Sequence, residues 1–423
     1  MRLRRRAVHV GTALIGAIGL ILGTSAVSAA AESSHELHDH ESHDHGHGPN
    51  GAVTVSTVAS GFDNPRGLAF GEEGQLYVAE AGKGGPACVP GGPEGPICPG
   101  LTGAISVITP SGSHHRIVNG LASLSGEGGV FATGPDGLSF NDESGLYTVI
   151  TSCPQQVGGL PAGSFPPSLV SALKTQAGQV VKLNSDGSFT PTAGVGAFDW
   201  DWSLTHTNLV PGQFPDCNPY AILADEHTQW VIDAATNTLD RVTSHGIEIV
   251  AFFPNPPVSD AVPTCVDRGP DGALYVGELT GGGNEPGASV VWRVDTRREH
   301  PVPEMWASGL TAVTGCSFVD GTFYATEFST LGLDNAAPGT GAVVRVPPHS
   351  AKPIPLVSNL NFPNGFAERG DDIYVSNWSI APAVLPAGAP FKPGEVVKIS
   401  FPEEHEHHSD HGHDEHHGHD NDD

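Results

Sequence analysis

Carboxylate and amide side chains recur at matching places in six repeated segments of this chain of 423 residues. Each segment contains a turn, a strand of small residues, a turn with glycine, and a strand centred on an aromatic residue. Where the second strand ends, the residues are Glu80, Ile150, Asp233, Glu278, Glu327 and Asn377. Where the first strand begins, they are Asn64, Asp136, Asn218, Thr264, Thr314 and Asn364. A ring of such oxygens can hold Ca²⁺ or another hard cation, and the cation could polarise a carbonyl group or activate a water.

Six of these residues form the candidate ligand-binding set: Glu80, Asp233, Glu278, Glu327, Asn364 and Asn377. Asp233 is also the candidate general base if the protein is an enzyme. The sequence contains no Gly-x-Ser-x-Gly elbow, phosphate-binding loop or His-Glu-x-x-His motif that would define a catalytic centre. An alternative stays open, because polar residues that cap strand ends and hydrate a central channel give the same pattern.

Histidines are concentrated in two acidic, low-complexity tails, which have too few apolar residues to fold alone. The N-terminal tail, residues 31–50, contains His35, His38, His40, His43, His45 and His47. The C-terminal tail, residues 402–423, contains His405, His407, His408, His411, His413, His416, His417 and His419. Imidazoles interleaved with carboxylates suit Zn²⁺, Ni²⁺ or Cu²⁺, so we expect several weak metal sites on the tails. The alternative is a pair of solvated tails that bind no particular ligand.

Repeats of strands and turns at this spacing predict an all-β fold, a six-bladed β-propeller over residues 51–401. The last repeat lacks an outer strand, and an alternating segment at residues 53–58 precedes the first repeat. We therefore expect residues 53–58 to pair antiparallel with residues 394–399, which closes the ring and removes its open edges. This closure would bring both tails out at the same rim of one blade.

The longest insertions are expected on one face of the propeller, which we call the upper face. They span residues 81–102, 151–177, 189–216, 279–287, 328–340 and 378–393. Long loops on one face of a rigid scaffold are where binding specificity usually lies. One insertion contains Asp199-Trp200-Asp201-Trp202, which could stack on a planar or sugar ligand or serve only packing.

Six cysteines are present, an even number that favours disulfides in an exported chain. Cys88 and Cys98 bracket a short Gly/Pro-rich loop and are expected to pair. For the rest we expect Cys153 with Cys217 and Cys265 with Cys316, one of 15 pairings that six cysteines allow.

The N-terminus resembles a secretory signal peptide over residues 1–30, with four early arginines, an apolar stretch and small residues before the cleavage region. No other segment has the ~20 apolar residues that a membrane span needs. The net charge of −28 argues against nucleic acid or an anionic membrane as partner. We expect a secreted, monomeric protein whose upper face binds a small molecule, a glycan or another protein.

Several runs resemble the ScyD/ScyE family of exported six-bladed propellers, including Asn64-Pro65-Arg66-Gly67 and Gly269-Pro270-Asp271-Gly272. This resemblance covers about residues 53–401 and implies the fold and export, with little information about chemistry. A more distant similarity is to NHL-like and SMP-30/gluconolactonase-like propellers, in which a Pro-Asn-Gly like Pro363-Asn364-Gly365 presents a metal-binding amide. Their Glu-Gly-Pro-x-Trp ligand signature has no match here, so the resemblance implies a metal ligand only at Asn364.

Two main functions follow, and the sequence does not decide between them. The first is an exported binding scaffold with metal-binding tails, which we favour. The alternative is a metal-dependent hydrolase or lactonase. In this function a cation such as Ca²⁺ would be held in the channel by Glu80, Glu278, Glu327 and Asn364. A third function is metal buffering by the tails, with the propeller as their carrier.

Overall fold

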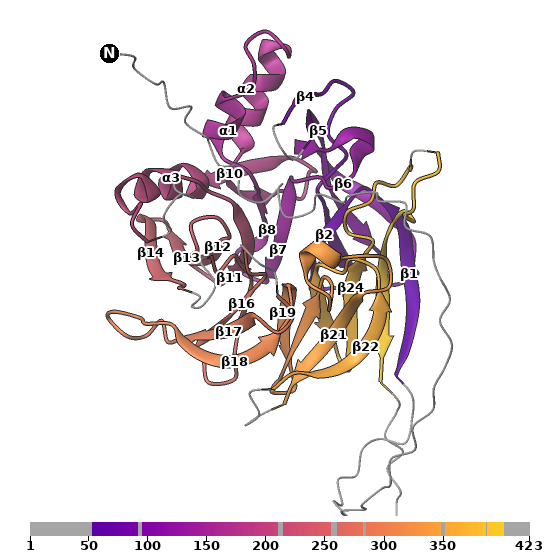
Figure 1. Ribbon diagram of the computed structural model, residues 1–423, viewed down its shortest axis with the longest axis vertical. Helices are drawn as coiled ribbons and strands as arrows, with labels where there is room; N and C mark the ends of the chain where they lie inside the picture. Colours follow the sequence, from indigo (N-terminus) through magenta and orange to yellow (C-terminus); the bar gives the residue numbers. More distant parts are fainter. Residues whose placement is uncertain are drawn as a thin grey trace, which may run out of the picture.

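Six antiparallel sheets stand around a common axis in the computed structural model, which describes residues 53–91, 95–209, 215–254, 260–281, 285–347, 352–385 and 387–401. Figure 1 shows these sheets as the blades of a propeller. The expected six-bladed β-propeller is confirmed. The signal peptide and both histidine-rich tails lie outside the described residues.

The blades follow one another along the chain, each with its innermost strand first. Blade 1 consists of β2 (Pro65–Phe70), β3 (Leu76–Glu80), β5 (Pro96–Ile108) and β6 (His114–Ser125), and the short β4 (Val89–Pro90) pairs with the start of β5. Blade 2 consists of β7 (Pro135–Asn141), β8 (Gly145–Ile150), β9 (Val180–Leu183) and β10 (Phe189–Ala193). Blade 3 consists of β11 (Pro219–Ala224), β12 (Gln229–Asp233), β13 (Thr238–Thr243) and β14 (Gly246–Phe252).

The second half of the ring repeats this order. Blade 4 consists of β15 (Pro263–Arg268), β16 (Leu274–Glu278), β17 (Ser289–Val294) and β18 (Glu304–Leu310). Blade 5 consists of β19 (Val313–Val319), β20 (Thr322–Glu327), β21 (Gly341–Val346) and β22 (Ile354–Leu360). Blade 6 consists of β23 (Phe366–Arg369), β24 (Asp372–Asn377), β25 (Gly394–Ser400) and, as its outer strand, β1 (Thr54–Phe62).

The ring closes through the pairing of β1 with β25, as the sequence predicts. The two strands are antiparallel, and Thr54 lies opposite Ser400 while Phe62 lies opposite Gly394. In Figure 1 the indigo β1 runs along the yellow end of the chain. Because every blade then has at least four paired strands, neither end of the repeat array leaves an unpaired inner edge.

Apolar side chains fill the spaces between neighbouring blades rather than one central core. Phe62 and Val396 from blade 6, for example, form a buried cluster with Leu68 and Val78 from blade 1. The innermost strands approach closely, and this explains their small residues. A Cβ added at Gly67 would lie 2.5 Å from the carbonyl oxygen of Asp136, and one added at Gly365 would collide with the carbonyl of Arg66.

The insertions carry the helices α1 (Pro154–Gly158), α2 (Pro167–Gln176) and α3 (Val195–Thr205), and the short 3₁₀ turns η2 (Glu127–Gly129) and η3 (Leu333–Asn335). Two expected insertion boundaries are wrong. Residues 189–193 form the outer strand β10, so the insertion that contains α3 begins after them, and β5 begins at Pro96, inside the insertion expected over residues 81–102. Within α3, Asp199 is fully buried, and Trp202 stacks on His206 at a ring distance of 4.1 Å.

All three expected disulfides are present. Cys88 joins Cys98 across the loop beside β4, and Cys153 joins Cys217 between two upper-face insertions. Cys265 joins Cys316 between β15 and β19, the innermost strands of blades 4 and 5. Disulfides are typical of oxidising compartments and favour an extracytoplasmic location. In the part of the chain that the structure describes, no helix has the length and apolarity to cross a membrane.

Candidate functional site

The residues at the ends of the second strands, here called the strand-end residues, are buried within the blades. They are Glu80, Ile150, Asp233, Glu278, Glu327 and Asn377. Four of them accept a hydrogen bond from a backbone N–H that precedes the innermost strand of the same blade: Asp63 to Glu80 at 2.7 Å, Asn218 to Asp233 at 2.8 Å, Thr311 to Glu327 at 2.8 Å, and Asn361 to Asn377 at 2.7 Å. These side chains therefore fix where each innermost strand begins.

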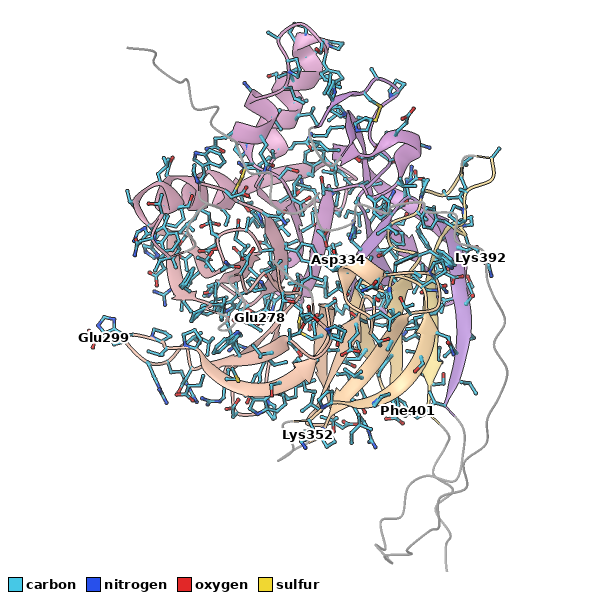
Figure 2. The ribbon with its side chains drawn as sticks, viewed as in Figure 1. Glu278, Glu299, Asp334, Lys352, Lys392 and Phe401 are labelled. Atoms are coloured by element: carbon cyan, nitrogen blue, oxygen red, sulfur yellow. A yellow bond between two sulfur atoms is a disulfide. The ribbon has the colours of Figure 1, made fainter. Side chains whose placement is uncertain are left out.

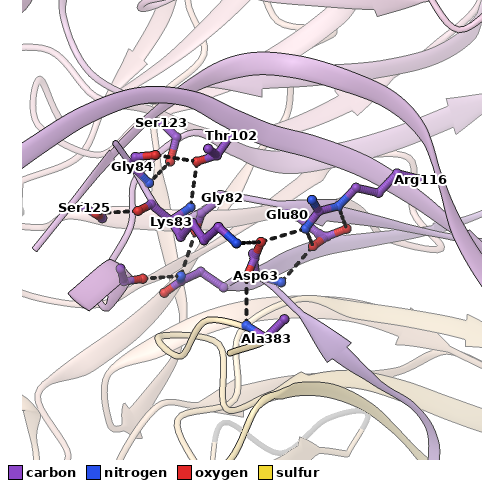
Figure 3. Close-up of polar contacts among 12 residues, drawn as sticks. Asp63, Glu80, Gly82, Lys83, Gly84, Thr102, Arg116, Ser123, Ser125 and Ala383 are labelled. Atoms are coloured by element: carbon purple, nitrogen blue, oxygen red, sulfur yellow. Dashed lines mark hydrogen bonds and ion pairs between the residues drawn. The ribbon is translucent and has the colours of Figure 1, made fainter. Parts of the chain in front are cut away.

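Glu80 lies in the most highly connected of these caps (Figure 3). Arg116 donates from Nε to Glu80 Oε1 at 2.9 Å and from Nη2 to Oε2 at 2.6 Å. The same Nη2 also donates to Asp63 at 2.8 Å, and the other oxygen of Asp63 accepts from the backbone of Ala383 at 2.7 Å. The network joins blade 1 to the insertion of blade 6. With Ser106 Oγ, which donates to Oε1 at 2.6 Å, each carboxylate oxygen of Glu80 has two donors, and Glu80 lines neither channel cavity.

Asp233, the candidate base, has a similar structural environment. Its carboxylate accepts from the backbone N–H groups of Asn218, Ala235 and Thr236, each at 2.8–2.9 Å. It also lies beside the buried carboxyls of Asp199 and Asp240, whose pKa values are raised well above their usual range by burial and by the neighbouring acids. This cluster lies between α3, which contains Asp199, and blade 3, and none of its three carboxyls lines the channel cavities.

Glu278 and Glu327 are each surrounded by their own blade. The indole N–H of Trp292 donates to Glu278 Oε1, while Oε2 has no hydrogen-bond partner. Burial raises the pKa of Glu278 to about 9 and that of Glu327 to about 7. Figure 2 shows Glu278 within the body of the molecule, whereas Glu299 lies at its periphery. Among the described residues, no three His, Cys, Asp or Glu side chains are placed to share a metal ion.

A different set of residues faces the axis. The repeats identify it when they are aligned on the proline or valine that starts the innermost strand in blades 1 to 5 and on Pro363, which precedes the innermost strand in blade 6. We call the residues that follow this proline or valine the channel ring. In blades 1 to 6 they are Arg66, Asp136, Tyr220, Thr264, Thr314 and Asn364. In blades 1 to 5 the pairing register shifts at this point. Such irregularities redirect side chains, and here they coincide with the residues that line the channel.

Sequence reasoning missed Arg66 and Tyr220 because it aligned Asn64 and Asn218, which precede a proline, with Asn364, which follows one. The repeated Pro-x-small pattern, as in Pro65-Arg66-Gly67 and Pro363-Asn364-Gly365, is the signal that could have found them. Asn64 instead holds the upper loops, since its amide donates to the carbonyls of Gly82 at 2.7 Å and Gly129 at 2.8 Å.

Five of the six channel-ring residues, all except Thr264, line a cavity of about 80 Å³ on the upper face and form much of its polar side. Its polar lining comprises Arg66, Thr133, Asp136, Thr151, Asn218, Tyr220, Thr314 and Asn364. Its apolar lining comprises Phe131, Leu279, Phe328, Leu333 and Ile380, which come from the loops and insertions above the strands. Of the ligand-binding residues expected from the sequence, Asn364 lies in this lining, and Asp136, Asn218 and Thr314 join it from the starts of the first strands.

A hydrogen bond across the axis divides the channel. Asn364 Nδ2 donates to Tyr220 Oη at 2.6 Å, and the two residues come from blades 6 and 3, which stand opposite each other in a ring of six. Asp136, Tyr220, Thr314 and Asn364 line both the upper cavity and a second cavity below it. The upper cavity therefore has a polar floor and an apolar roof.

Arg66 and Asp136 supply the charge at this floor. Arg66 is 8% exposed and Asp136 is 2% exposed. Arg66 Nη2 donates to the carbonyl of Ala132 at 2.7 Å, and its Nε lies 3.8 Å from Asp136 Oδ2. Burial raises the pKa of Asp136 to about 7, with the Arg66 charge opposing the shift. Burial, and then the charge of Asp136, also raise the pKa of Tyr220, so its phenol stays protonated and can donate a hydrogen bond.

Comparison with known proteins gives only distant likenesses. No family model matches the chain, so the resemblance to the ScyD/ScyE family stays a prediction. No curated protein matches either. Among solved structures, virginiamycin B lyase from Staphylococcus aureus is similar at 12% identity and TM-score 0.44, over 83% of this chain and 100% of that chain.

Two other solved structures give comparable values. A gluconolactonase from Xanthomonas campestris is similar at 8% identity and TM-score 0.49, over 83% of this chain and 90% of that chain. An aldose sugar dehydrogenase from Streptomyces coelicolor, in its PQQ-bound form, is similar at 12% identity and TM-score 0.45, over 84% of this chain and 99% of that chain. At these values the likenesses carry no argument about the site.

Proposed function

We propose that this protein is an exported β-propeller that binds a small molecule in the upper channel cavity. The observation that carries the proposal is the cavity itself, where Arg66, Asp136, Tyr220 and Asn364 converge beneath an apolar roof. A concave, partly apolar site with a few convergent polar groups is the usual form of a small-molecule site. The roof comes from several insertions, which gives these loops a shared role.

The test is a fragment screen by ligand-detected NMR on the mature chain. Fragments that bind the cavity should lose affinity in Arg66→Gln and Asn364→Ala and keep it in Arg345→Gln, a matched change at an exposed position of β21. Binding that persists in all three variants would place the ligand elsewhere and contradict the proposal.

Hydrolase or lactonase activity remains the alternative function. Of the cation ligands expected for it, Asn364 lines the cavity, while the strand-end acids cap the blades. Asp136, with its pKa near 7, is better placed than Asp233 to exchange a proton with a bound ester. Lactone hydrolysis by the mature chain with added Ca²⁺, lost in Asp136→Asn, would support this function; no turnover under those conditions would argue against it.

The metal-binding role proposed for the tails is independent of the cavity. One observation favours joint binding: Thr54 and Ser400 are paired across β1 and β25, so the described chain ends that lead into the two tails lie side by side. Deleting either residues 31–50 or residues 402–423 from the mature chain should then weaken Zn²⁺, Ni²⁺ or Cu²⁺ binding by the other tail. Independent, additive losses would show that the tails act separately.

A further inference from the structure

The Arg66 guanidinium has a donor that the protein leaves unused. Its Nε has no hydrogen-bond partner although it is buried. The carboxylate of Asp136 lies 3.8 Å away, which is close enough for attraction between charges and too far for a hydrogen bond. A buried donor without an acceptor is unfavourable, so a ligand that supplied the acceptor would recover the lost free energy.

The floor of the cavity offers a second donor near the same place. Because Tyr220 Oη accepts from Asn364 Nδ2 at 2.6 Å, its own O–H remains to be donated. The charge of Arg66 also acts on the Tyr220 phenol, where it opposes the rise in the pKa of Tyr220. Two donors, one of them cationic, together make a receptor for an anionic oxygen rather than for an ammonium group.

The remaining lining restricts the rest of the ligand. Five apolar side chains, Phe131, Leu279, Phe328, Leu333 and Ile380, form the roof. A cavity of about 80 Å³ has room for a group of only a few non-hydrogen atoms. The ligand should therefore be short, with an apolar chain and one charged end.

We infer that the cavity binds a short monocarboxylate, with its carboxylate held by Arg66 and Tyr220 and with Asp136 protonated in the complex. This inference rests on the proposed binding function and specifies its ligand class. The ligand anion replaces Asp136 as the partner of Arg66, and a proton from solvent then neutralises Asp136, because two adjacent carboxylates would repel each other. Overall, one ligand anion and up to one proton enter the site, and no covalent bond changes.

Two charged or titratable groups act on Asp136 among the described residues, Arg66 from β2 and Tyr220 from β11. Arg66 favours the ionised carboxylate, while burial favours the protonated acid. Since burial is the larger effect, a ligand that engages Arg66 removes the main force keeping Asp136 ionised.

The experiment uses three probes with one carbon skeleton: butyrate, butyramide and n-butylamine. Each is titrated calorimetrically into the mature chain from pH 6 to pH 9, in two buffers with different ionisation enthalpies. Butyrate should bind best, and its affinity should fall about tenfold per pH unit above the pKa of Asp136. The buffer dependence should show uptake approaching one proton at the alkaline end.

Variants separate this inference from a general binding role. Asp136→Asn should bind butyrate with an affinity that no longer depends on pH, and without proton uptake. Asp142→Asn, a matched change at an exposed position of the same blade, should behave as the wild type. Arg66→Gln should lose butyrate binding by at least tenfold.

The other outcomes are equally informative. Preferred binding of butyramide or n-butylamine, lost in Arg66→Gln, would overturn the ligand class and leave the proposed binding function standing. Butyrate binding without pH dependence would overturn the role of Asp136. Absence of binding by all three probes overturns the inference, and an empty fragment screen as well would remove the proposed function with it.

Discussion

The channel ring and the strand-end residues both place a polar side chain in most blades, yet their polar atoms find different partners. Strand-end carboxylates and amides are largely satisfied by backbone N–H groups of their own blade, as with Asp233 and Asn218. In the channel ring, Arg66 retains an unused donor and Asp136 lies beside a cavity. A polar side chain that recurs at equivalent positions around a propeller is therefore a candidate binding residue only where its own blade does not satisfy its hydrogen-bonding atoms.

The two regions also differ in what varies between blades. The strand-end residues keep one type of role, as an acceptor for backbone, in four of six blades. The channel ring instead has a cation, an acid, a phenol, two hydroxyls and an amide at equivalent positions. Uniform chemistry suits a repeated structural requirement, while mixed chemistry suits the recognition of one asymmetric molecule.

The largest expected effect is the loss of a strand-end acid. Glu80→Ala removes the acceptor for Arg116, Ser106 and the backbone of Asp63, and leaves a partly buried cation with fewer partners. We expect a loss of about 3 kcal/mol in the free energy of unfolding, measured by urea denaturation. Glu72→Ala, at an exposed turn of the same blade, is the control. A loss below about 1 kcal/mol would show that the cap is not the structural unit described above.

The next effect is the contribution of Glu278 to the pH dependence of the free energy of unfolding. Its folded-state pKa of about 9 exceeds the usual 4.5, so folding favours the protonated acid. Its contribution to stability is complete below about pH 4.5 and is lost as the pH rises towards 9. Over this range the free energy of unfolding should fall as the pH rises, because the folded protein holds a proton that the unfolded chain releases.

Glu278→Gln should remove that part of the slope, because the amide does not titrate. The measurement is urea denaturation between pH 5 and pH 9. Glu299→Gln changes the same group at the exposed periphery and should leave the slope intact (Figure 2). An unchanged slope in Glu278→Gln would mean that other buried acids, such as Asp199 and Asp240, account for the alkaline sensitivity.

The hydrogen bond across the channel gives a smaller effect. Tyr220→Phe removes the acceptor for Asn364 Nδ2 and makes the floor between the upper and lower cavities less polar. The free energy of unfolding should fall by about 1 kcal/mol, and butyrate affinity should fall as well because a donor is lost. Tyr374→Phe, on β24, is the control for the loss of a phenol outside the channel. Unchanged butyrate affinity in Tyr220→Phe would exclude the phenol from the site.

The sequence predicted the blades and their closure because both depend on local patterns. Runs such as Leu76-Tyr77-Val78 alternate and are rich in residues that favour strands, and the unpaired segment before the first repeat had only one edge to join. The upper-face location of the insertions followed from strand direction alone, and the cavity lies under them.

The orientation of the polar residues could not be predicted in the same way. Side chains alternate between the two faces of a strand, so a shift of the pairing by one residue reverses their direction. Register shifts occur at the start of five innermost strands, next to Arg66, Asp136, Tyr220, Thr264 and Thr314. Nor does a terminal Glu or Asp reveal from sequence whether the backbone will supply its partners, as it does for Glu327.

The smallest expected effect is a difference in butyrate affinity between variants of two channel-ring threonines, Thr264 and Thr314. Thr264 Oγ1 donates to the carbonyl of Val313 at 2.6 Å, and Thr314 Oγ1 donates to that of Pro363 at 2.9 Å. Each bond joins neighbouring blades near the start of their innermost strands, so Thr264→Val and Thr314→Val should each lower the free energy of unfolding by about 1 kcal/mol. Their positions differ, because Thr314 lines both cavities and Thr264 lines only the lower one.

Butyrate affinity should therefore fall a few-fold in Thr314→Val and stay at the wild-type value in Thr264→Val. Since the two variants remove the same group and lose the same type of bond, stability serves as the internal control for affinity. Equal losses of affinity would mean that binding responds to the rigidity of the ring as a whole. Loss in Thr264→Val alone would move the ligand from the upper cavity to the lower one.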